Sequence, residues 1–235
     1  MTGSVVIPGR FNGPPTSANG GYCCGLLAAH VHGTARVRLH SPPPLDTPMQ
    51  VESNQDGHVE LRLKAQLVAS ARPGSFTAEV PNPPSLEEAA SAAQRFAAYE
   101  SHIYPGCFVC GVARGRNDGL NLHPGPVRDW SLLACTWQPG SDLLDRHGSV
   151  RDEITWSALD CPGYFAAAGP DLPGALLGEL CAELRSPVPG SETLVVYSWP
   201  IGTNGRKIFG GTAIARGDGE VLAASHSTWI VLRQD

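Results

Sequence analysis

The chain has 235 residues, of which 42% are hydrophobic and 17% charged, a composition typical of a compact globular protein. The net charge of −5 at pH 7 and the absence of any run of Lys and Arg argue against a nucleic-acid or anionic-membrane partner, since both bind a dense basic face. Residues 1–15 resemble no export signal, no stretch is long and apolar enough to span a membrane, and the seven cysteines are an odd number. We therefore expect a cytoplasmic protein whose thiols are reduced.

The first third of the chain predicts a helix followed by antiparallel strands. The segment "GYCCGLLAAH", which begins at Gly21, is small and apolar and favours a buried helix. A Pro-rich turn follows in "RLHSPPPLDTP", and the pair Asp56-Gly57 is typical of a two-residue hairpin turn. Residues 58–70 then predict one strand.

A short helix is expected to link this unit to the next. Ser85 followed three residues later by Glu88 is a capping-box signature, and small apolar residues recur on one face of residues 85–102. Two units, 1–84 and 106–235, are therefore predicted on either side of a linker at 85–105.

The second unit repeats the order of the first. "GYFAAAG" from Gly163 again opens a small-residue helix, and Leu-x-Ser-Pro-x-Pro occurs at both Leu39 and Leu184. Asn204-Gly205 and Asp218-Gly219 separate predicted strands at 194–201, 207–216 and 221–232. Chance similarity of two Pro-rich turns is the alternative to a true repeat. The predicted class is α+β.

These segments resemble a known family. The helix openings "NGGYCCGLLAA" and "DCPGYFAAA", together with "CFVCG", "DGLNLHPGPV" and "WSALDCPGYFA", are similar to motifs of double hotdog acyl-CoA thioesterases and of uncharacterised bacterial thioesterase-like proteins. The resemblance implies two repeats, each with a central helix wrapped by a long antiparallel sheet. It also implies a homodimer of the full chain, and a substrate that carries coenzyme A without any further cofactor.

The resemblance also implies a role for Asp160. In the family, an aspartate on the second central helix acts with a Thr and a Gln to activate water against the thioester. "TWSALD" matches the setting of the aspartate, Thr228 stands where the family has Gln, and no residue matches the Thr. The resemblance therefore favours thioester hydrolysis, with a non-catalytic acyl-CoA or lipid-binding protein as the alternative and a hydratase or dehydratase as a third class.

The residues themselves leave the role of Asp160 open. Asp160 precedes Pro162, so its side chain could cap the helix that begins there. A partly buried carboxylate could instead serve as a base or nucleophile beside an apolar acyl channel, or it could be a satisfied polar group in the core.

Other candidate residues surround the predicted helix starts. Asn19 is a helix cap or an amide that orients the substrate, and N–H groups near Gly20, Gly21 and Gly163 could stabilise an oxyanion. The candidates for the acyl pocket are aromatic: Tyr22, Trp156, Tyr164 and Phe165.

Two further motifs carry weaker signals. Cys107 and Cys110 form a Cys-x-x-Cys pair that could bind zinc with His102 and His123, although two unligated thiols or a redox pair are alternatives. Arg114 and Arg116 could meet the phosphates of coenzyme A, or could belong to a solvated basic loop.

Overall fold

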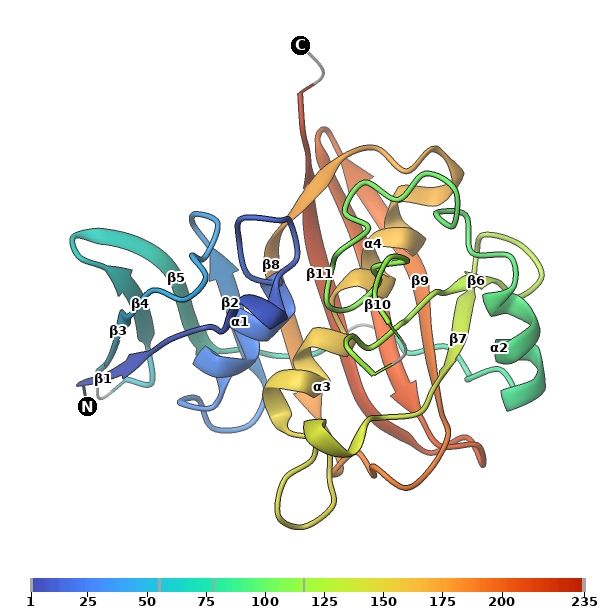
Figure 1. Cartoon of the computed structure of the whole chain (residues 1–235), viewed down its shortest axis with the longest axis horizontal. Helices are drawn as coiled ribbons and strands as arrows, with labels where there is room; N and C mark the ends of the chain where they lie inside the picture. The colour runs from blue at the N-terminus through green and yellow to red at the C-terminus, as the bar shows by residue number, and fades with distance from the viewer. Residues whose placement is uncertain (1, 55, 78, 116, 234–235) are drawn as a thin grey trace.

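The computed structural model describes residues 2–54, 56–77, 79–115 and 117–233 (Figure 1). All strands among them belong to one antiparallel sheet in the order β1-β3-β4-β5-β2-β8-β11-β10-β9-β7-β6. Strands from the first third of the chain make up one half of the sheet, and strands from the second part make up the other half. This order follows the two predicted units.

The first half of the sheet surrounds α1 (Gly20–Ala28). A short 3-10 turn, η1 (Gly9–Phe11), precedes this helix. The strands of this half are β1 (Thr2–Val5), β2 (Ala35–Leu39), β3 (Met49–Ser53), β4 (Val59–Leu63) and β5 (Gln66–Pro73).

The second half carries α3 (Asp152–Ala158) and α4 (Cys161–Ala168), with short 3-10 turns at η2 (Ser141–Leu143) and η3 (Gly169–Asp171). Its strands are β6 (Gly125–Pro126), β7 (Leu133–Trp137), β8 (Ala175–Leu184), β9 (Leu194–Asn204), β10 (Lys207–Ala215) and β11 (Val221–Val231). Helix α4 packs on β9 and β10.

The predicted hairpins are present, but only the turn between β9 and β10 has two residues, since the last pairs around the other turns are Ser53 with Val59 and Ala215 with Val221. Gly57, Gly205 and Gly219 adopt positive φ angles of 73°, 57° and 96° at the turns where Asx-Gly pairs were recognised. The single strand predicted at 58–70 is wrong, because the chain turns back at Lys64, whose φ is 54°, and residues 59–73 form the hairpin of β4 and β5.

The two halves meet at the centre of the sheet, where β2 pairs with β8 and Val37 lies opposite Leu180. Leu39 and Leu184, which open the two Leu-x-Ser-Pro-x-Pro segments, are the last residues of these two strands. The repeated sequence therefore lies at corresponding strand ends, as expected if the two halves share one plan.

Helices α1 and α3 also join the halves, and two glycines of α1 allow them to approach closely. A Cβ atom on Gly21 would lie 2.5 Å from the Trp156 carbonyl oxygen, and one on Gly25 would lie 2.5 Å from the Glu153 Cα atom. Residues four apart share one helix face, so these two glycines form a flat contact surface against α3.

The linker helix α2 (Leu86–Ala93) is shorter than predicted and packs against β7. The capping box of Ser85 and Glu88 is present as predicted. Ala89 and Ala92 belong to a second apolar cluster with strand residues such as Tyr197, whose hydroxyl donates to the Pro81 carbonyl at 3.0 Å. The segment before α2 is thereby fastened to the sheet.

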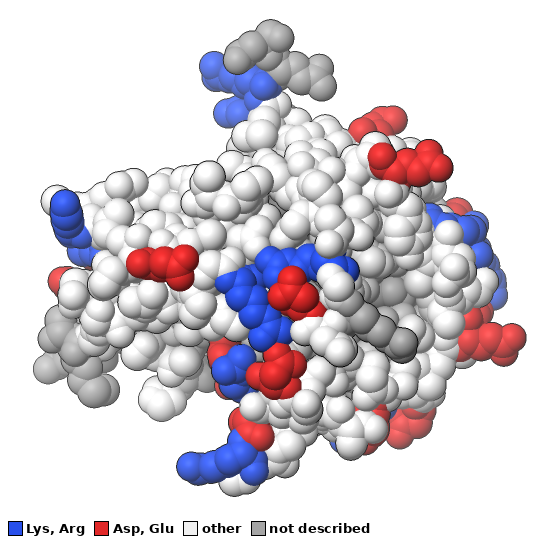
Figure 2. Space-filling model, viewed as in Figure 1, with Lys and Arg blue, Asp and Glu red and all other residues white. Residues whose placement is uncertain are grey.

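The charged residues seen in Figure 2 are mixed in sign. Ion pairs among the described residues include Arg10 with Asp142 at 2.5 Å and Arg114 with Asp118 at 3.0 Å. Across the part of the chain that the structure describes, no helix has the length and apolar character needed to cross a membrane.

Candidate active site

Asp160 lies between α3 and α4 and is 2% exposed. Although it occupies the position before α4, its side chain makes no capping hydrogen bond to that helix. Its Oδ2 atom instead accepts a hydrogen bond from the Gly21 N–H and another from Asn19 Nδ2, both at 2.8 Å. The cap proposed from the sequence is therefore wrong for α4, because the carboxylate contacts the first turn of α1.

Asn19 is the cap of α1, which is one of the two roles that the sequence left open, and its amide also contacts Asp160. Its Oδ1 atom accepts the Tyr22 N–H at 2.9 Å and so caps α1, while its amide nitrogen holds Asp160. The carboxylate thus lies at the positive end of the α1 dipole, where a negative charge is favoured.

Burial nevertheless raises the pKa of Asp160 from 3.8 to about 7. The Gly21 N–H bond lowers this pKa, negative charge on Cys107 raises it and the Asn19 bond lowers it, but loss of hydration has the largest effect. The second oxygen, Oδ1, is buried and has no hydrogen-bond partner among the described residues. One carboxylate oxygen is held in place and the other has free acceptor capacity.

Asp160 and Asn19 line a cavity of about 290 Å³. Its wall is largely apolar and comes from the first turns of α1 and α4, the Pro-rich turn after β2, the start of β8 and the end of β11. Representative lining residues are Gly20, Leu39, Pro43, Tyr164, Phe165, Leu177, Trp229 and Ile230.

Two of the four predicted pocket aromatics reach this cavity. Tyr164 and Phe165 line it, whereas Tyr22 and Trp156 do not. The Tyr22 ring stacks on Phe11 with ring centres 4.1 Å apart, and Trp156 packs where α3 meets Gly25 of α1. The predictions for Tyr22 and Trp156 are therefore corrected. Helix α1 is buried on several sides, and its Tyr22 packs in the core and not on the cavity. Trp156 belongs to α3 and lies at the contact of that helix with α1.

Of the three predicted oxyanion positions, only one lines the cavity. Gly20 lines the cavity in the first turn of α1, where N–H groups lack acceptors within the helix. The Gly21 N–H is engaged by Asp160, and the Gly163 N–H donates to the Asp160 carbonyl at 3.1 Å. Gly163 also lies against Ser227 and Thr212 of the sheet, so Gly20 is the candidate that faces the cavity.

Thr228 is not among the cavity residues. Its neighbours Ser227 and Trp229 lie near α4, with Ser227 Oγ close to Gly163 and the Trp229 ring tilted against Tyr164 with ring centres 5.2 Å apart. Successive strand residues face opposite sides of a sheet, so Thr228 faces away from α4. Its predicted catalytic role finds no support in this geometry, whereas Trp229, which the sequence analysis did not assign to the pocket, lines the cavity.

The predicted coenzyme A arginines are not supported as a phosphate site. The Arg114 side chain is 10% exposed, pairs with Asp118 and donates to Asn12 and to the Arg10 carbonyl. These bonds hold the loop and leave little of the guanidinium for a ligand. Arg116 lies outside the described residues.

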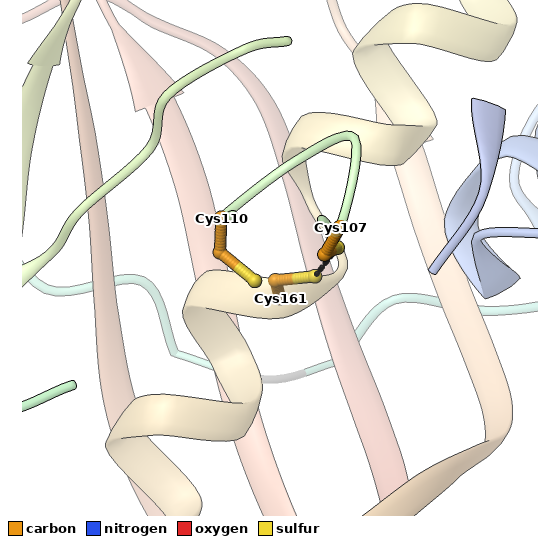
Figure 3. Close-up of side chains that lie close together, drawn as sticks. All are labelled: Cys107, Cys110 and Cys161. Atoms are coloured by element: carbon orange, nitrogen blue, oxygen red, sulfur yellow. Dashed lines mark hydrogen bonds between the residues drawn. The ribbon is translucent and has the colours of Figure 1, made fainter. Parts of the chain in front are cut away.

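The Cys-x-x-Cys pair lies beside Asp160. Cys107, Cys110 and Cys161 are buried, line the cavity, and have sulfur atoms within 4.8 Å of one another (Figure 3). His102 and His123, the other predicted zinc ligands, are not part of this cluster. Cys161 was missed because it lies 51 positions after Cys110, although it follows Asp160 directly.

The three thiols influence one another. Hydrogen bonds from Cys110 and Cys161 hold the pKa of Cys107 well below its usual range. Burial, followed by the bond to Cys107, raises the pKa of Cys110, whereas the bonds to Cys107 and Cys110 are the largest causes of the raised pKa of Cys161. Of the three thiols, Cys107 is therefore the one whose pKa is lowered by its neighbours.

Comparison with known proteins supports the architecture. No protein-family model and no curated protein matches the sequence. Among solved structures, a TesB protein of Mycobacterium avium subsp. paratuberculosis matches over 99% of this chain and 93% of its own, at 13% identity and a TM-score of 0.64. A candidate thioesterase II from Thermobifida fusca matches over 99% of this chain and 94% of its own, at 16% identity and a TM-score of 0.65.

An acyl-CoA thioesterase II from Mycobacterium marinum matches over the full chain and 94% of its own, at 11% identity and a TM-score of 0.64. The chain has the fold of the thioesterase II proteins. This likeness confirms the predicted resemblance to thioesterases and the hotdog-like architecture of a large antiparallel sheet with few helices. At these identities it concerns the fold, so the chemistry must be argued from the site.

Proposed function

We propose that this chain hydrolyses the thioester of an acyl-CoA, with the acyl group in the cavity and Asp160 at the reacting carbon. The proposal also takes the two halves of the sheet as two hotdog repeats, with the site at the contact between their helices. The observation that carries the proposal is the carboxylate itself, which is buried in an apolar cavity with Oδ2 held by two donors and Oδ1 without a partner.

The arrangement suits attack on a carbonyl carbon. Oδ1 of Asp160 can take a proton from a water molecule whose oxygen attacks the thioester, or it can attack the carbon itself. In the first route the carbon–sulfur bond breaks as water adds, which gives a carboxylic acid and the free thiol. In the second route the thiol leaves first and an anhydride between the acyl group and Asp160 remains, which a water molecule then hydrolyses to the carboxylic acid and the free carboxylate. Support for stabilisation of the negative charge on the carbonyl oxygen comes from Gly20, which lines the cavity in the first turn of α1, where the helix dipole favours negative charge.

The test is thiol release from short, medium, long and aromatic acyl-CoAs, measured for the wild type, Asp160→Asn and Asp152→Asn. Asp152 is an exposed carboxylate in the first turn of α3 and serves as the matched control. We expect turnover by the wild type and the control, and a loss of a hundredfold or more in Asp160→Asn with an unchanged circular dichroism spectrum. Full activity in Asp160→Asn would refute the role of Asp160.

A second candidate function is acyl-CoA binding without turnover. It is favoured by the position of Thr228, since only the aspartate of the family's three catalytic positions is found at the cavity. Trp229 lines the cavity, so its fluorescence should respond to a bound acyl-CoA in either case. Binding without thiol release for every substrate would select this alternative. The predicted homodimer and cytoplasmic location stay predictions, the first of which light scattering would test.

A further inference from the structure

The three clustered thiols are held by two rigid parts of the structure (Figure 3). Cys107 and Cys110 lie in a tight turn that the Gly111 N–H closes on the Cys107 carbonyl at 2.9 Å. Phe108 and Val109, between the cysteines, are fully buried, and their carbonyls accept the Leu120 and Leu122 N–H groups. Cys161 is the first residue of α4. The backbone that carries the three sulfurs is therefore held in place before any ligand arrives.

The spacing of the sulfur atoms is that of a metal site. The Sγ atoms of Cys107 and Cys161 are 3.8 Å apart. A tetrahedral zinc ion with zinc–sulfur bonds of about 2.3 Å separates its sulfur ligands by about 3.8 Å, whereas a disulfide needs about 2.05 Å. All three sulfurs lie within 4.8 Å of one another, so small rotations would bring each to bonding distance of one ion.

We propose that Cys107, Cys110 and Cys161 bind one zinc ion as three thiolates. Thiolates are soft ligands that select zinc over magnesium or calcium, and each thiol loses its proton to solvent when the ion binds. The amide of Asn19, 3.8 Å from Cys161 Sγ, offers a donor to the negatively charged cluster.

The fourth position of this zinc ion is open. Cys107, Cys110 and Cys161 line the cavity together with His102 and Asp160. Among the described residues, no histidine or carboxylate brings a ligand atom within 4.8 Å of all three sulfurs. Three protein ligands with one free position are typical of zinc ions that bind a water or an external ligand. The site is therefore a place where a small thiol or water in the cavity can bind, and not the closed four-ligand site that Cys107, Cys110 and two histidines would make.

The first measurement is zinc content of the wild type purified without chelator, together with cobalt(II) titration of the chelator-treated protein. We expect about one zinc ion per chain. We also expect a near-ultraviolet thiolate-to-cobalt charge-transfer band and the visible bands of a tetrahedral ion. Addition of 2-mercaptoethanol should shift these bands, because the fourth position is accessible.

Two variants test the ligands. Cys161→Ala should lose the cobalt bands and most of the zinc, whereas Cys23→Ala, which removes a fully buried thiol of α1 outside the cluster, should retain both. Cys110→Ala is the second ligand variant and is used if Cys161→Ala fails to fold. Because the readouts are metal content and cobalt spectra, they are independent of thioester turnover.

The proposal is overturned by a wild type that holds no zinc and gives no cobalt bands, or by a foldable Cys161→Ala that binds as much metal as the wild type. It is also overturned if thiol titration of freshly purified, denatured protein finds five free thiols of the seven, since a disulfide would then occupy the cluster. Cobalt bands that do not respond to 2-mercaptoethanol would reject the open position.

Discussion

Replacement of Gly25 by alanine should destabilise the protein, although alanine is the better helix former. Gly25 lies within α1, and its Cβ atom would be 2.5 Å from the Glu153 Cα atom and 2.9 Å from the Trp156 Cβ atom. The first of these atoms is backbone of α3, so the contact is relieved only if the two helices move apart.

The magnitude is a difference of two terms. Overpacking of a rigid contact costs about 1–3 kcal/mol, and at this distance from backbone we expect the upper part of that range. Replacing a helical glycine by alanine gains roughly 0.5–1 kcal/mol. Gly25→Ala should therefore lower the free energy of unfolding by about 1–2 kcal/mol.

Urea unfolding followed by circular dichroism measures this change as a lower midpoint at constant slope. Gly3→Ala is the control, because nothing lies within 4 Å of a Cβ atom at that position. Separation of α1 from α3 also moves the Gly21 N–H away from Asp160, so catalytic activity should fall together with stability. A Gly25→Ala variant as stable as the wild type would show that α1 and α3 are not in the close contact described above.

Three further predictions follow from other parts of the molecule. Burial and then the Arg36 charge lower the pKa of His226, which also faces Glu179, Phe76 and a half-buried sheet surface. As pH falls below about 6.5 the unfolded chain therefore binds the proton first, so the melting temperature of the wild type should drop more between pH 7 and 5 than that of His226→Gln. An equal drop in both proteins would contradict this prediction. The cavity of about 290 Å³ is at the small end of ligand pockets, so kcat/KM should be higher for short and medium acyl-CoAs than for long ones, and a preference for long chains would contradict this assignment of the acyl site. Ser85→Ala removes both the acceptor of the Glu88 N–H and the capping box of α2, and should cost about 1 kcal/mol in urea unfolding, whereas Ser91→Ala on the exposed side of α2 should change little.

The fold was predictable where local chemistry decides structure. The glycines of the Asx-Gly pairs at 56–57, 204–205 and 218–219 adopt positive φ, which glycine accepts more readily than any other residue, so these pairs mark turns. Ser85 and Glu88 mark the start of α2 because the capping box involves residues three apart. The turn at Lys64 was missed because Lys has no turn preference, and its positive φ is imposed by the pairing of β4 with β5.

The candidate site was only partly predictable, because it is built from contacts between distant segments. Asp160 and Asn19 were recognised as separate helix-start residues, yet their hydrogen bond joins positions 141 residues apart. Tyr22 and Tyr164 follow the same Gly-Tyr pattern, but the first stacks on Phe11 and the second lines the cavity. Because α1 is buried nearly all round, its sequence carries no amphipathic pattern that would distinguish these directions.

The clustering of Cys161 with Cys107 and Cys110 also depends on a contact between distant segments of the chain. The Cys-x-x-Cys turn can be recognised in the sequence as two candidate ligands. The third cysteine of the cluster, Cys161, joins them only because the turn packs against the start of α4. Sequence spacing alone pointed to His102 and His123, which lie nearer in the chain and outside the cluster in space.

The most direct test of the account is the ratio of kcat/KM for the wild type and Asp160→Asn on the best acyl-CoA, with acyl-CoA affinity followed in parallel through Trp229 fluorescence. The account predicts a ratio of about 10² or more with affinity nearly unchanged, because Asp160 acts on the reacting carbon and the cavity wall remains intact. A ratio near one, with both proteins folded and turning over substrate, would contradict the assignment of this cavity and this carboxylate as the active site.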